Sequence, residues 1–379
     1  VYKRQAICDL ITNLLEGRNG PSGLALYSSI DEVETELRLM TLDPERHLYG
    51  AYFAGADGAN AEDGKLHFLV NNLYGRRTEI KQLFSGFERV VEDATCEFIL
   101  VSGKSGTGKS ALVEQMRSLM SARNVGYFVS GKYDVQKTAR PLFAISTALG
   151  KYCDMLLMEN SGFGTEIIEE RKKQISDAIG TNGKVLVNLI PSLAKIIDGA
   201  ELAQVIAPSR QVLNQLMFFL RIFVQTVATQ SHPLVLFLDD LHWADQASLE
   251  FIRIIVNDEE SQSLLIVGCY RDNEVTLDHP LALERMRIVK SGANFTEIEV
   301  GIIKRESVNE MVSDLLLQSP QQTQPLADLI HNKTGGNAYY VIQFLQSLEA
   351  DGLLQYLSLI HISEPTRQEA ISYAVFCLK

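Results

Sequence analysis

The sequence predicts an α/β fold, in which a parallel sheet is flanked by helices and followed by a helical lid domain. Three observations carry this prediction. Short, continuous apolar runs recur along the chain, as is typical of parallel strands buried on both faces. Segments with helical spacing of apolar residues alternate with these runs. A glycine-rich segment joins one of the runs to a helix. The apolar runs are 98–101, 126–130, 234–238 and 264–268.

Helical patterns account for most of the chain between and after these runs. Apolar residues recur at helical spacing over 80–91. The stretch 141–230 is predicted to be mostly helical, and its last amphipathic helix spans about 211–229. Beyond the final apolar run, we expect helices separated by polar loops up to Tyr356.

Residues 103–110 read G-K-S-G-T-G-K-S, a complete G-x-x-x-x-G-K-S motif, called the phosphate loop below. The apolar run before it and the helical composition of Ala111–Met116 after it supply the strand, loop and helix that the motif requires. Backbone N–H groups of such a loop and the helix N-terminus converge and attract anionic phosphate. The alternative is a chance match in a glycine- and serine-rich turn, and the flanking segments argue against it.

A pair of acids completes the predicted site. The apolar run 234–238 ends in Asp239 and Asp240. The carboxyl end of a parallel strand faces the same crevice as the phosphate loop, so one acid can hold Mg²⁺ and the next can orient a water. Two solvated acids at a strand end are the alternative for this feature alone. Loop and acids together predict a P-loop nucleoside triphosphatase (NTPase).

Both termini resemble translated sequencing adapter, so we expect the natural protein to span about 6–356 and to be an internal fragment of a longer chain. Residues 7–17 resemble a helix late in the large lobe of protein kinases. The expected divisions are adapter translation at 1–5 and 357–379, an upstream segment at 6–71, a P-loop ATPase core at 72–278 and a helical lid at 279–356.

Composition narrows the class of protein. With 46% hydrophobic and 22% charged residues, the chain can bury a sizeable core. A formal net charge of −12 argues against a broad nucleic-acid surface. The cysteines show no C-x-x-C spacing, which favours buried free thiols in a reducing, cytoplasmic setting. No apolar run approaches membrane-spanning length, so no membrane partner is expected.

Five segments occur in an order that resembles a known family. They are L-Y-G-R-R-T-E at 73–79, the phosphate loop, L-D-D-L-H-W-A-D at 238–245, Y-R-D at 270–272 and T-G-G-N-A-Y-Y at 334–340. Together they resemble the AAA-type ATPase module of the signal-transduction (STAND-class) P-loop NTPases, found in large multidomain kinases and nucleotide cyclases. The sequence departs from the family at Arg77, often an acid or another polar residue there, and at Ala338, usually a proline.

The resemblance and the chemistry of the residues together imply an ATP and Mg²⁺ site. Lys109 is expected to neutralise charge on the β- and γ-phosphates, and the Ser110 hydroxyl to bind Mg²⁺ with Asp239. Asp240 is expected to position or activate the attacking water. The nucleotide-contacting set in the phosphate loop and after it is Gly103, Ser105, Gly106, Thr107, Gly108, Lys109, Ser110 and Ala111.

Three further residues are assigned through the resemblance. Arg271 resembles a catalytic sensor near the γ-phosphate, and Arg76 resembles the residue entering the nucleotide pocket. Asn337 belongs to an element that resembles the nucleotide-sensing part of the lid. The alternative for Arg271 is a surface cation in a turn, and the alternative for Arg76 is a salt bridge at a helix start. For the element that contains Asn337, the alternative is a turn connecting two helices. His242 and Trp243 are expected to pack structurally rather than to act in catalysis.

The function predicted from these features is an ATP-binding and hydrolysing regulatory switch within a larger signalling protein, with its catalytic output in other domains of the same chain. An origin-recognition-like DNA-associated ATPase is one alternative, and a basic winged helix beyond Tyr356 would favour it. A nucleotide-binding scaffold without turnover is another, and it would not need Asp240. Self-association and the choice between ATP and GTP stay open at this point.

Overall fold

The computed structural model describes residues 72–123, 125–134, 140–157, 165–180, 184–197, 210–316, 318–351 and 354. The chain divides into two compact units, and the unit Asn71–Gln346 holds the elements below apart from the end of the last helix. The predicted adapter segments, the upstream segment and its kinase-like helix lie outside the described residues.

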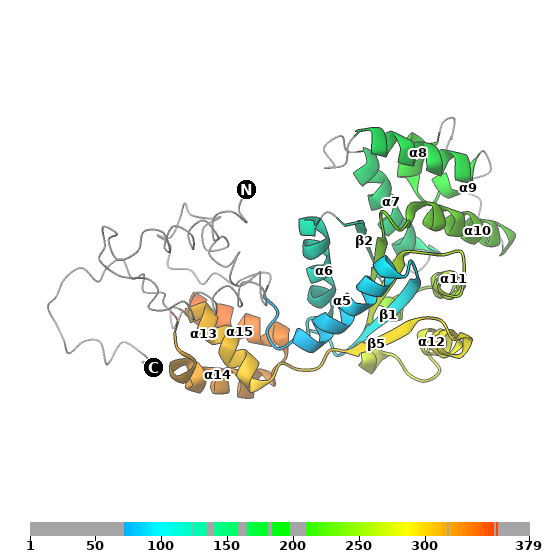
Figure 1. The fold of residues 1–379 in the computed structure, drawn as a ribbon. Helices are drawn as coiled ribbons and strands as arrows, with labels where there is room; N and C mark the ends of the chain where they lie inside the picture. Colours follow the sequence, from blue (N-terminus) through cyan, green and yellow to red (C-terminus); the bar gives the residue numbers. More distant parts are fainter. Residues whose placement is uncertain are drawn as a thin grey trace, which may run out of the picture. The chain divides into compact units, whose positions relative to one another are not determined.

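Five parallel strands form a sheet in the order β2–β3–β4–β1–β5 (Figure 1). The strands are β1 (Cys96–Ser102), β2 (Tyr127–Lys132), β3 (Leu234–Asp239), β4 (Leu264–Tyr270) and β5 (Phe295–Glu299). Every residue of β1 and β4 is buried, because both strands have neighbours on each side and helices over both faces. The predicted α/β fold and its four strands are therefore confirmed.

Strand β5 was not predicted, and it corrects the boundary of the core. Its sequence, F-T-E-I-E, has two apolar residues, Phe295 and Ile298, and only Ile298 is buried. That pattern suits an edge strand, which lies next to β1 alone. Because β5 follows residue 278, the predicted core ended too early: the sheet continues to Glu299, and the helices of the lid begin at Arg305.

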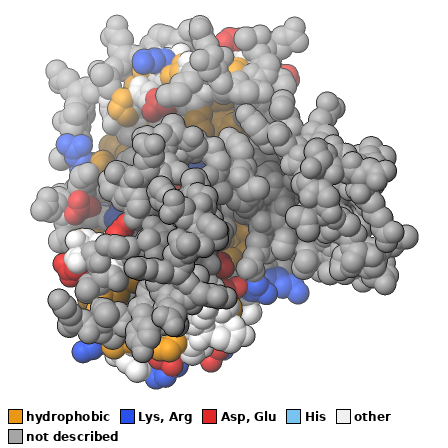
Figure 2. All heavy atoms as spheres, turned by 90° about the vertical axis from the view of Figure 1, so that its left-hand side faces the viewer, with side chains coloured by type: hydrophobic (Ala, Val, Ile, Leu, Met, Phe, Trp, Pro, Cys, Tyr) orange, Lys and Arg blue, Asp and Glu red, His pale blue; other side chains and the backbone are white. Residues whose placement is uncertain are grey.

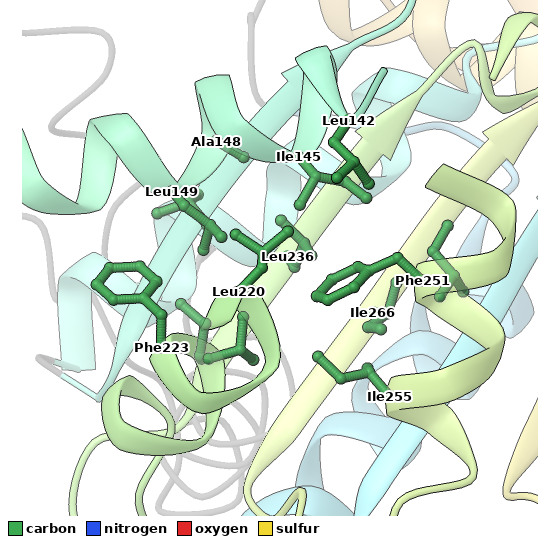
Figure 3. Close-up of a cluster of buried hydrophobic side chains, with 14 of the residues drawn as sticks. Leu142, Ile145, Ala148, Leu149, Leu220, Phe223, Leu236, Phe251, Ile255 and Ile266 are labelled. Atoms are coloured by element: carbon green, nitrogen blue, oxygen red, sulfur yellow. The ribbon is translucent and has the colours of Figure 1, made fainter. Parts of the chain in front are cut away.

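Alternate residues of the strands point to opposite faces of the sheet. On each face they belong to a separate cluster of buried hydrophobic side chains. Ile99 and Val101 pack with helices α5 (Arg77–Glu92) and α6 (Lys109–Arg123). The opposite face is covered by α7 (Phe143–Leu157), α10 (Arg210–Val227), α11 (Gln246–Val256) and α12 (Pro280–Ser291). Figure 3 shows this second cluster, where Leu236 and Ile266 from the strands lie near Phe251 of α11.

The described parts of the long connection between β2 and β3 are mostly helical, in agreement with the prediction for this stretch. It contains α7, α8 (Thr165–Ile179), α9 (Lys184–Val187) and α10. The predicted amphipathic helix at 211–229 is α10, which buries Leu220 and Phe223. This connection therefore adds a helical layer over one face of the sheet.

After β5 come the lid helices, which are α13 (Arg305–Leu316), α14 (Pro320–Thr334) and α15 (Ala338–Ala350). Val308, Ile330 and Val341, one from each helix, are fully buried, and α13 packs against α14. None of the described helices is long and apolar enough to span a membrane.

Two further observations bear on composition. Cys96 and Cys269 are free and buried, as predicted from the apolar runs that they border, and Cys153 is free and buried as well. Acidic and basic side chains both appear among the described residues on the face drawn in Figure 2.

Candidate nucleotide-binding site

The phosphate loop joins β1 to α6, and its glycines permit close approach of other backbone. Gly103 and Gly106 have φ angles of 151° and 78°, which favour glycine. A Cβ on Gly103 would lie 2.4 Å from the Val300 carbonyl oxygen, and one on Gly106 would lie 2.6 Å from Asn337 Oδ1. The chain that leaves β5 and the lid therefore both press against this loop.

Lys109 lies at the start of α6 with its side chain turned into the loop. Its Nζ donates to the carbonyl oxygens of Gly103 and Lys104, each at 2.8 Å. Burial lowers the pKa of Lys109 because the charged ammonium loses water there. A buried cation whose hydrogen-bond acceptors are neutral carbonyls is well matched to an anionic phosphate.

Ser110 and Asp239 meet at the predicted metal position. The Ser110 hydroxyl donates to Asp239, with its Oγ 3.0 Å from Oδ1 and 3.1 Å from Oδ2. A hydroxyl and a carboxylate are hard oxygen ligands, and Mg²⁺ commonly takes one or two of them together with water and substrate phosphate. The donor set therefore fits Mg²⁺.

Asp240 adopts an unusual backbone conformation directly after β3. Its φ and ψ of 54° and 44° are left-handed, a region where Asp is tolerated better than most residues and which is often found at functional sites. Its carboxylate turns toward Lys132, whose Nζ lies 3.0 Å from Asp240 Oδ2 and 3.5 Å from Asp239 Oδ2. The hydrogen bond with Asp240 is the main cause of a raised Lys132 pKa.

Sequence reasoning missed Lys132. It ends β2, and β2 pairs with β3 so that Lys132 stands opposite Asp239. The two strands are separated by about a hundred residues of sequence, so the pairing could be found only from the order of the strands. The signal that was available is the position of Lys132 at the carboxyl end of a predicted strand.

Arg271 reaches the same acids from the end of β4. Its Nε lies 3.8 Å from Asp240 Oδ1, and its Nη1 donates to Glu274 at 2.7 Å. The guanidinium also lies over the Trp243 ring, 5.1 Å from the centroid. Arg271 is thus a cation of the acid cluster, not a solvated cation in a turn.

Arg76 contacts the phosphate loop from its carbonyl side. Its Nη2 donates to the Thr107 carbonyl at 3.0 Å and to the Gly301 carbonyl at 2.6 Å, and the residue is buried. It also forms the alternative salt bridge, with Glu79 at 3.3 Å. Arg76 therefore ties the phosphate loop to the chain that follows β5.

Asn337 links the lid helices to the phosphate loop. Its side-chain amide donates to the Ser105 carbonyl at 2.8 Å, and the backbone N–H of Tyr339 donates to the Gly106 carbonyl at 2.9 Å. Ile303, in the connection from β5, donates to the Gly336 carbonyl at 2.7 Å. The segment between α14 and α15 is therefore more than a turn between two helices, because it binds the loop directly.

The site residues predicted from the sequence thus lie around one loop. Lys109, Ser110, Asp239, Asp240 and Arg271 line one side of it, and Arg76 and Asn337 bind its backbone.

Comparison with known proteins identifies the family of this domain. A family model for the AAA ATPase domain matches residues 72–267. The chain belongs to the AAA ATPase domain family. Hybrid signal transduction histidine kinase G of Dictyostelium discoideum is 25% identical to this AAA ATPase chain, over 76% of the chain and 10% of that protein. The chain therefore spans about a tenth of that relative's length.

Solved structures also resemble the AAA ATPase chain. Cdc6p from Pyrobaculum aerophilum superposes with a TM-score of 0.45 at 14% identity, covering 74% of this chain and 64% of that one. The Orc1 protein of Aeropyrum pernix, solved in complex with DNA, has a TM-score of 0.41 at 14% identity, with coverage of 74% and 62%.

Proposed function

We propose that this AAA ATPase chain binds Mg-ATP, hydrolyses it slowly, and acts as a regulatory switch within a larger signalling protein. The single observation that carries the proposal is the direct bonding of the lid to the phosphate loop by Asn337 and Tyr339. A loop that holds phosphates and is also held by a separate helical unit couples nucleotide binding to the position of that unit.

The binding step follows from the loop chemistry. The N–H groups of Gly106 to Ser110 and the N-terminus of α6 attract the phosphates, and Lys109 exchanges its two carbonyl partners for phosphate oxygens. Ser110 and Asp239 would hold Mg²⁺, which neutralises negative charge on the phosphates when bound.

The hydrolytic step requires Asp240 to accept a hydrogen bond from the attacking water. In the structure its carboxylate is shared between Lys132 and Arg271. Two neighbouring cations make a carboxylate a weaker hydrogen-bond acceptor. Activation of water by Asp240 therefore requires Lys132 or Arg271 to change its partner. This arrangement supports slow, regulated turnover rather than rapid catalysis.

The switching step follows from the bonds between lid and loop. Binding of phosphate changes the conformational preferences of Ser105 and Gly106, whose carbonyls are held by the lid. A ligand shifts a two-state equilibrium only through a difference in affinity for the two states. Here that difference would arise at these two carbonyls, and ATP would favour the closed lid.

The place of the switch in a larger protein is also part of this proposal. The relative that matches 76% of the chain bears the name of a signal transduction kinase, and the chain spans only 10% of it. We therefore infer that the partners are nucleotide and other domains of the same longer chain, in the cytoplasm.

The test measures Mg-ATP affinity and turnover of the whole chain and of Asp240→Asn. We expect slow hydrolysis by the wild type, and in Asp240→Asn unchanged affinity with turnover lowered by about 100-fold. Binding without hydrolysis in the wild type would mean a nucleotide-binding scaffold. Normal turnover in Asp240→Asn would remove this residue from its assigned role.

A further inference from the structure

Two short turns at the carboxyl ends of β3 and β4 bring together side chains to which the proposed mechanism gives no role. The turn Leu241–Trp243 follows β3, and the turn Asp272–Glu274 follows β4. Because β3 and β4 are paired neighbours, the two turns lie next to each other beside Asp240. His242 and Trp243 come from the first turn, and Glu274 comes from the second.

Glu274 uses both of its carboxylate oxygens. Oε1 accepts a hydrogen bond from Arg271 Nη1 at 2.7 Å, and Oε2 lies 3.3 Å from His242 Nε2. The spacing explains the first contact, since side chains three residues apart lie over one another in a 3₁₀ turn. The second contact crosses to the neighbouring strand's turn. His242 Nε2 makes no hydrogen bond to the described residues, so the buried imidazole limits the movement of Glu274 by packing beside it.

Trp243 completes a closed ring of contacts. The Arg271 guanidinium lies 5.1 Å from the centroid of the Trp243 ring, and the His242 and Trp243 ring centroids are 4.7 Å apart. Only 1% of the His242 side chain is exposed, so this imidazole is a rigid support. Arg271, Trp243, His242 and Glu274 therefore each touch two others of the ring.

The ring orients one edge of the guanidinium toward the acid cluster. Glu274 occupies Nη1, whereas Nε lies 3.8 Å from Asp240 Oδ1. That separation is longer than a hydrogen bond, so the edge made by Nε and Nη2 is not committed to Asp240. Two parallel donors on one guanidinium edge suit a phosphoryl oxygen pair.

We propose that Glu274 and Trp243 are positioning residues for Arg271, which they hold beside Asp240 with that edge turned toward the γ-phosphate of ATP. His242 packs against the Glu274 carboxylate. Donors that are oriented before the reaction stabilise developing charge without reorganising, which is the physical advantage of such a support. The inference rests on the proposed function, because it assigns the γ-phosphate to the site beside Asp240.

A double-mutant cycle on the whole chain tests the proposal. The variants are Arg271→Ala, Glu274→Gln and both together, and the readouts are kcat for Mg-ATP and the ratio of the ADP and ATP dissociation constants. Loss of Arg271 is expected to lower kcat about 100-fold, and Glu274→Gln about tenfold. The double variant should be no worse than Arg271→Ala, because Glu274 acts only through Arg271.

The affinity ratio should follow the same pattern, because only ATP presents a γ-phosphate. Arg271→Ala lowers the preference for ATP, and Glu274→Gln lowers it less and has no effect in the Arg271→Ala background. Asp272→Asn is the matched control, since it removes an exposed carboxylate from the same turn without touching Arg271, and it should leave both readouts unchanged.

Trp243 provides a second, independent variant pair. Trp243→Phe retains an aromatic face for Arg271 and should retain most activity, whereas Trp243→Leu removes it and should resemble Glu274→Gln. This comparison keeps the proposal testable if the charge variant proves unstable.

Additive effects of Arg271→Ala and Glu274→Gln on both readouts would overturn the proposal, as would a Glu274→Gln variant equal to wild type. Absence of turnover in the wild type would contradict the proposed hydrolysis instead. The ratio of the ADP and ATP dissociation constants would then test the positioning role alone. Non-additive effects of the two substitutions on this ratio would support the role, and additive effects would reject it.

Discussion

Lys109 is buried, and its hydrogen-bond partners are neutral carbonyl oxygens. The first prediction at the scale of single residues follows from this arrangement. Lys109→Ala removes a cation that faces the proposed phosphate position. Loss of a charge-assisted contact costs about 1.5–3 kcal/mol, which weakens affinity about 10- to 100-fold. Mg-ATP titration of the purified chain measures it. Lys104→Ala is the control, because this lysine is exposed in the same loop, and equal affinities in the two variants would reject the assignment.

Lys132 gives the second prediction at this scale. Its Nζ bridges Asp239 and Asp240, and 65% of its side chain is exposed, so the ion pair contributes at most about 1 kcal/mol. Lys132→Gln frees Asp240 to accept a hydrogen bond from water, and basal turnover should rise, up to about fivefold. Steady-state hydrolysis at saturating Mg-ATP checks this.

Lys151→Gln controls for the loss of an exposed lysine that bonds the backbone of β2. A tenfold fall in turnover for Lys132→Gln would contradict the prediction and make Lys132 a phosphate-stabilising cation.

At the scale of single residues, the sequence predicted those site residues that lie together in one short segment. The phosphate loop and the two acids could be located because each lies in one short segment with a recognisable flank. Lys132 and Glu274 could not, since each meets its partner only after strand pairing places β2 and β4 on either side of β3. Their distances to Asp240 and His242 are products of the sheet, not of any local spacing.

At the scale of elements, Asp245 shows how the same acidic segment builds structure. It is the N-cap of α11, and its carboxylate accepts from the backbone N–H and the hydroxyl of Ser248 at 3.0 and 2.6 Å. It also accepts from the backbone N–H of Leu142 at 3.2 Å, just before α7. One side chain therefore joins two helices that cover the same face of the sheet.

Asp245→Ala should lower the free energy of unfolding by about 1–2 kcal/mol, because the cap of α11 is lost. Asp245→Asn retains the cap acceptor and should lose less. Thermal and urea unfolding of both variants tests this, and equal stability of Asp245→Ala and wild type would show that the cap contributes nothing.

The elements themselves were largely predictable, with one instructive exception. Buried central strands appear as continuous apolar runs, so β1, β3 and β4 are visible in the sequence. Strand β5 is a half-exposed edge strand with two glutamates, and a five-residue segment with two apolar residues resembles a polar loop. Because β5 was not predicted, the core was predicted to end at residue 278.

At the scale of the whole unit, the connection 300–304 joins the sheet to the lid helices. The backbone N–H of Val300 donates to Ser102, the Gly301 carbonyl accepts from Arg76, and the backbone N–H of Ile303 donates to Gly336. Lys304 and Arg305 are exposed next to these contacts, so trypsin can report on them.

The most direct test of the central claim is the rate of tryptic cleavage at Lys304 and Arg305 with and without Mg-ATP. We predict that saturating Mg-ATP slows cleavage about tenfold, which corresponds to a difference in affinity for the two lid positions of about 1.4 kcal/mol. Asn337→Ala should reduce this protection, and Gln343→Ala, an exposed change on α15, should not. Identical cleavage rates with ATP shown to be bound would contradict a nucleotide-driven lid.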